Sequence, residues 1–174
     1  MFLSGKPISV DGIEIPSNNP VFLALIGIHV LAAMVCVVSG VVAMLSKKLP
    51  GYHPKSGNIY FWCLLVVFVT VVIISVLRWD EDRHLLLLGS LSFGAAFFGR
   101  SAERIRWHGW VIYHIICMGS SYILLITAFY VDNGKFLPVW KNYSPVLYWT
   151  LPAAIGIPII LYTLFNHPLA KTKW

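Results

Sequence analysis

Five long apolar runs without a charged residue constrain this chain more than any other feature of its sequence. They cover residues 21–45, 59–77, 85–99, 109–131 and 145–165. A helix that crosses a bilayer needs about 17–25 apolar residues, and the third run alone is shorter than that. We expect its helix to continue to residue 105, because arginine side chains at a helix end reach the headgroups. The sequence therefore predicts five membrane-spanning helices, the third at 85–105.

The amino-acid composition supports the same fold class. Hydrophobic residues make up 58% of the chain and charged residues 11%, whereas soluble domains carry about 25% charge. So few charges would not cover a globular surface in water, but a lipid-facing surface needs none. The net charge of +6 is spread over short clusters between the runs, so we expect no nucleic-acid partner. The predicted fold is an all-α membrane bundle in contact with the lipid bilayer.

The distribution of basic residues predicts the orientation of this bundle. Eight of them share one side: Lys47, Lys48, Lys55, Arg100, Arg104, Arg106, Lys171 and Lys173. The other side holds five, Lys6, Arg78, Arg83, Lys135 and Lys141, together with most of the acidic residues. By the positive-inside rule the first set is cytoplasmic. Residues 1–20 are then an extracytoplasmic segment and 166–174 a cytoplasmic tail. The expected location is the inner (cytoplasmic) membrane.

Residues at the ends of the runs are typical of helix boundaries. Asn19-Pro20 and Ser144-Pro145 each place a capping side chain before a proline at the first helical position. Leu49-Pro50-Gly51 is expected to end the first helix. The acidic residues 80–82 are expected in a hydrated connection before the third helix.

Histidines are the ionisable residues that remain as candidates for chemistry at depth. No Asp, Glu, Lys or Arg lies in the core of a run, which argues against a proton- or ion-coupled transporter. No phosphate loop, HExxH motif or serine–histidine–acid arrangement is present, so hydrolase and nucleotide-binding functions have no support in the sequence. The candidate site residues are His29, His53, His84, His108 and His114.

The candidate histidines follow the predicted topology. His29 and His84 lie near the outer ends of the first and third helices, at similar depth. His53 and His108 each follow a basic inner loop, and both pairs, 29/53 and 84/108, are 24 residues apart. This spacing suggests a weak parallel repeat of two helical hairpins. His114 is the third inner histidine.

Two histidines at one depth on two helices suit the axial ligation of a haem iron. We therefore predict haem b, with His29 and His84 at an outer site and ligands drawn from His53, His108 and His114 at an inner one. A stripe of small residues beside His29 either accepts another helix or admits the flat macrocycle; it comprises Ala33, Cys36, Gly40 and Ala43. A soft-metal site at His114, Cys117 and Met118 is the alternative at the inner side.

Several of these motifs resemble a bacterial family of multi-pass membrane proteins of unknown function. The similarity covers residues 22–162 and rests on His29, the basic loop at 53–57, Trp107-His108, His114 with residues 119–122, and the T-A-F element at 127–129. The loop differs from the family pattern at Pro54 and Lys55. The resemblance implies a membrane bundle with intramembrane histidines. The histidine layout is similar to that of diheme b-type membrane cytochromes.

These observations favour a haem-binding protein that transfers electrons to or from a redox partner in the membrane. The alternative is a cofactor-free accessory or assembly subunit of a larger membrane complex. A metal or small-solute carrier is the third hypothesis.

Overall fold

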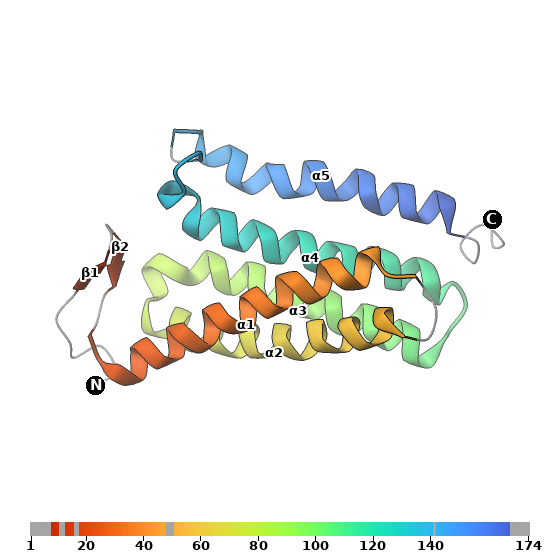
Figure 1. Cartoon of the computed structure of the whole chain (residues 1–174), viewed down its shortest axis with the longest axis horizontal. Helices are drawn as coiled ribbons and strands as arrows, with labels where there is room; N and C mark the ends of the chain where they lie inside the picture. Colours follow the sequence, from red (N-terminus) through yellow and green to blue (C-terminus); the bar gives the residue numbers. More distant parts are fainter. Residues whose placement is uncertain (1–7, 11–12, 16–17, 48–50, 141, 168–174) are drawn as a thin grey trace. The chain divides into compact units, whose positions relative to one another are not determined.

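The computed structural model describes residues 8–10, 13–15, 18–47, 51–140 and 142–167 of the chain. In this part, five helices are long and apolar enough to cross a membrane (Figure 1). They are α1 (Pro20–Leu45), α2 (Tyr52–Leu77), α3 (Trp79–Ile105), α4 (Trp110–Asn133) and α5 (Pro145–Asn166). This confirms the predicted all-α fold with five membrane-spanning helices. The short strands β1 (Ile8–Val10) and β2 (Ile13–Ile15) pair antiparallel, and the 3-10 turn η1 (Gly134–Phe136) follows α4.

The predicted capping residues begin two of the helices. Asn19 Oδ1 accepts the Val21 N–H at 2.9 Å, and Ser144 Oγ accepts the Val146 N–H at 3.4 Å, with proline at the first helical position in both cases. Each contact satisfies a backbone donor that has no acceptor within its own helix.

Two helices begin earlier than the apolar runs suggest. α2 begins at Tyr52 rather than at 59, because Pro54 lies in the first turn, where a missing N–H breaks no helical bond. α3 begins at Trp79 rather than at 85, and its first turn holds Asp80, Glu81 and Asp82. The three residues therefore belong to the helix and not to the connection before it, and carboxylates in a first turn stabilise the positive end of the helix dipole. α1 ends at Leu45, and Leu49 and Pro50 of the expected helix stop lie outside the described residues. The same holds for 168–174 of the predicted tail.

The chain forms two compact units, Met1–Leu86 and Leu87–Trp174. In the first unit, α1 packs on α2 (Figure 1). Cys36 is fully buried and its thiol donates to the Tyr60 carbonyl at 3.5 Å. Ser39 and Gly40 are buried as well. Of the two alternatives for the stripe, the structure therefore shows helix packing at Cys36 and Gly40.

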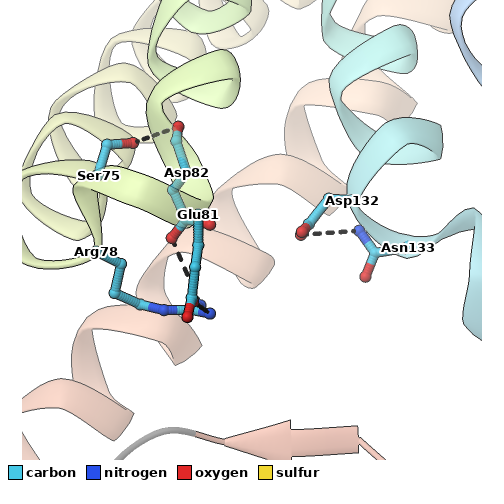
Figure 2. Close-up of polar contacts among 6 residues, drawn as sticks. All are labelled: Ser75, Arg78, Glu81, Asp82, Asp132 and Asn133. Atoms are coloured by element: carbon cyan, nitrogen blue, oxygen red, sulfur yellow. Dashed lines mark hydrogen bonds and ion pairs between the residues drawn. The ribbon is translucent and has the colours of Figure 1, made fainter.

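The turn from α2 to α3 is held by polar contacts (Figure 2). Arg78 alone separates the two helices. Its guanidinium pairs with Glu81 and, at 3.5 Å, with the carboxylate of Asp82, which is buried. Ser75, fully buried, donates its hydroxyl to the Asp82 carbonyl at 3.2 Å. The contact between residues on either side of Arg78 shows that the chain reverses direction there.

In the second unit, α4 and α5 interlock through two glycines. A Cβ added at Gly119 of α4 would lie 2.6 Å from Ile160 Cγ1 of α5. A Cβ added at Gly156 of α5 would likewise collide with Ile123 of α4. The absence of a side chain at each glycine thus leaves space for an isoleucine of the other helix. Small residues that allow two backbones to approach closely are typical of membrane helix pairs.

Candidate functional site

The His29 imidazole of α1 hydrogen-bonds across to α2. Its Nδ1 lies 2.8 Å from the hydroxyl oxygen of Thr70, and Thr70 is 5% exposed. The single hydroxyl proton of Thr70 is donated to the carbonyl of Val66 or Val67, at 2.8 and 2.9 Å. Thr70 Oγ1 must therefore accept from His29, which places a proton on Nδ1. In the neutral imidazole, Nε2 is then the nitrogen that carries the lone pair.

His53 makes a similar bond at the other end of the same helix pair. The sequence placed His53 in the loop before this helix. In the structure it is the second residue of α2 and lies within the helix. Its Nδ1 lies 2.8 Å from the Ala43 carbonyl, one of the last carbonyls of α1, which lack a partner in their own helix. A carbonyl only accepts, so Nδ1 of His53 is protonated as well.

His114 of α4 shows the same pattern in the second unit. Its Nδ1 lies 3.0 Å from the Gly99 carbonyl of α3. The two helices approach closely here, because a Cβ at Gly99 would lie 3.0 Å from Cys117 Cβ and 3.2 Å from Met118 N. Trp110 contacts the imidazole edge-on, with ring centroids 6.4 Å apart.

The other two candidates have different surroundings. His84 is the sixth residue of α3 and is partly exposed, and His108 is exposed in the connection between α3 and α4. In the suggested repeat, His84 corresponds to His29 and His108 to His53. Relative to the start of its helix, each of the two lies about one helical turn before the position of its supposed equivalent. His114 bonds to a carbonyl of the preceding helix as His53 does. The counterpart of His53 is therefore His114 rather than His108. The 24-residue spacing therefore does not mark equivalent positions.

Helix geometry relates the depths of the three histidines in the first unit. Thr70, which contacts His29, precedes the end of α2 by seven residues, or about 10 Å at the rise of an α-helix. His84 follows the start of α3 by five residues, or about 8 Å. Since the chain reverses at Arg78, His29 and His84 lie at similar depth. His53 contacts α1 fourteen residues beyond His29, about 21 Å away, so these two do not share one iron.

The buried hydroxyl groups of Thr70 and Ser92, which join neighbouring helices, were not predicted from the sequence. Thr70 fixes the tautomer of His29 as described above. Ser92 of α3 donates its hydroxyl to the Ser121 carbonyl of α4 at 2.8 Å, and both serines are buried. A hydroxyl residue within an apolar run could have indicated them, because Ser and Thr side chains commonly hydrogen-bond between membrane helices.

In the described part of the chain, no three or more His, Cys, Asp and Glu side chains gather as a metal-ion site. The chain was also compared with protein-family models, with curated proteins and with solved structures, and none of them matches it.

Proposed function

We propose that this membrane protein binds haem b, with Nε2 of His29 and Nε2 of His84 as axial ligands of one iron, and that it transfers electrons in the membrane. The observation that carries the proposal is the hydrogen bond from His29 Nδ1 to Thr70. Histidines that ligate a metal commonly donate one ring N–H to a fixed acceptor, which orients the ring and makes the other nitrogen more basic. The similar depth of His29 and His84 further supports this pair.

His114 is the first candidate for a second haem. Its Nδ1 is also bound to a backbone carbonyl, and it lies on an apolar helix without Asp, Glu, Lys or Arg in its core. An imidazole at such depth is costly unless it has a partner or a role.

The test is a haem assay with a reduced-minus-oxidised spectrum on protein expressed with added haem. We expect a red protein with a sharp reduced absorption band. His29→Ala should remove one haem, and His114→Ala should remove a different one. His167→Ala, at the end of α5, is the matched control and should leave the spectrum unchanged. A folded wild-type protein that stays colourless after haem supplementation would overturn the proposal.

The second candidate function is a cofactor-free subunit of a larger membrane complex. It is favoured by the same hydrogen bonds, because each of them joins two helices, and by the packing of the α1 stripe against α2. Apolar side chains such as Leu31 and Val146 are 66% and 65% exposed and face lipid or another subunit. In this case His29→Ala lowers thermal stability in a protein that shows no haem spectrum at all.

A further inference from the structure

We propose that Arg104 and Arg106, beside Trp110, bind the phosphate of an anionic phospholipid headgroup at the connection between α3 and α4. This inference does not depend on haem binding. It rests on the charge, the backbone conformation and the aromatic contacts of this connection, all within the second unit.

The two arginines are exposed cations that pair with no carboxylate in the described part of the chain. Neither Arg104 nor Arg106 takes part in an ion pair with any residue that the structure describes. Glu103 is the one acidic residue of this part of α3, and its spacing from Arg100 is that of neighbours on a helix. Among the described residues, the guanidinium groups of Arg104 and Arg106 therefore have no paired anion. The planar guanidinium group matches the geometry of a phosphate, to which it can donate two parallel hydrogen bonds.

The backbone of Arg106 indicates that its side chain matters at this position. Arg106 has φ 55°, in the left-handed region, and its N–H donates to the Ala102 carbonyl at 2.9 Å. This conformation ends a helix and is normally adopted by glycine, which has no Cβ to crowd the backbone. An arginine is unfavourable there, yet its guanidinium carbon comes to lie 5.8 Å from the centre of the Trp110 ring.

An aromatic cluster places these charges at the level of the headgroups. The Phe98 ring lies 5.5 Å from Trp107 and 6.3 Å from Tyr113, and Trp107 lies 6.0 Å from Tyr113. Trp and Tyr rings concentrate where the apolar layer meets the headgroups. A cation fixed beside such rings meets a lipid phosphate rather than bulk solution, and basic sites next to membrane helices are known to select anionic lipids.

Lys135 provides a matched control. Its ammonium lies 4.9 Å from the centre of the Phe136 ring in η1, so it is also an exposed cation against an aromatic ring. However, it is a single cation, and Asp132 of α4 is only three residues away.

The experiment uses the purified, delipidated full chain in detergent and measures the first lipid adduct by native mass spectrometry. Phosphatidylglycerol is the anionic probe, phosphatidylcholine the zwitterionic one and inorganic phosphate the competitor. We expect tighter binding of phosphatidylglycerol than of phosphatidylcholine, and affinity about five-fold weaker for each of Arg104→Gln and Arg106→Gly. Lys135→Gln should bind as the wild type does. Arg106→Gly suits the backbone at this position, so impaired folding would not explain its loss of binding.

Three outcomes would overturn the proposal. Equal affinity for the two lipids would show that charge is not recognised. Unchanged binding by Arg106→Gly, or an equal loss in Lys135→Gln, would show that this connection is not the site. Displacement of the lipid by millimolar inorganic phosphate would identify a soluble anion as the ligand.

Discussion

Thr70 illustrates how one hydroxyl determines the chemistry of the histidine beside it. The hydroxyl proton is committed to a carbonyl of its own helix, so the oxygen accepts the Nδ1 proton of His29. The result is one defined tautomer and one defined ring orientation. The same bond serves packing, because it joins α1 to α2, and it serves ligation, because it makes Nε2 the basic nitrogen.

We predict that Thr70→Val destabilises the protein by about 1 kcal/mol, the range measured for hydrogen bonds between membrane helices. The change removes the acceptor of a partly buried imidazole N–H. Thr150→Val is the control, because the hydroxyl of Thr150 is exposed and, among the described residues, donates to the Val146 carbonyl of its own helix at 3.0 Å. Thermal unfolding in detergent measures both. If the two variants unfold at the same temperature, the bond between His29 and Thr70 contributes nothing to stability.

The candidate histidines were identifiable from the sequence, but their partners were not. A histidine in an apolar run stands out by its polarity alone. The acceptors are Thr70 and the carbonyls of Ala43 and Gly99, and they depend on the rotation and offset of neighbouring helices. Apolar runs do not specify that register, since most of their side chains can face lipid equally well.

At the scale of elements, apolar length predicted the number of helices, and polar chemistry determined where two of them begin. The run at 85–99 is short because the first turn of α3 consists of acidic residues, which hydropathy excludes and the helix dipole favours. α2 begins before its apolar run for a similar reason, since His53 and Pro54 fit a first turn. The caps at Asn19 and Ser144 were predictable, because side-chain capping depends on local sequence.

Helix pairing can be tested at the interlocked glycines of α4 and α5. We expect Gly119→Ala to destabilise the protein by about 1–3 kcal/mol, because the new methyl group would overlap Ile160. In the background of Ile160→Ala the same change should cost much less. Gly27→Ala is the control, because a Cβ at Gly27 of α1 meets nothing within 4 Å. Unfolding free energies of the two single variants and the double variant give the coupling energy between Gly119 and Ile160. If the two destabilisations simply add, the proposed contact between these residues is contradicted.

At the scale of the whole molecule, the five apolar helices make this a membrane protein, and we propose its orientation from the charges that flank them. Basic residues set topology because cytoplasmic loops retain them during insertion. Three of the eight cations on the proposed cytoplasmic side flank the α1–α2 connection and three the α3–α4 connection; two belong to the tail. The proposed lipid site in the α3–α4 connection would then face the cytoplasmic leaflet, which is the anionic one in many membranes.

Reporter fusions test this orientation in a bacterial host. A reporter that is active only outside the cytoplasm should be active after Asn133, between α4 and α5, and silent after His53 or Trp174. The fusion after His53 interrupts α2 at its second residue, so it still reports the side on which α1 ends. A reporter that is active only in the cytoplasm should give the opposite result at all three positions. Activity outside the cytoplasm for the His53 fusion would place Lys47, Lys48 and Lys55 outside, against the bias that retains basic residues in the cytoplasm. That result would reverse the proposed orientation of the five described helices, because the side of one connection determines the side of the next.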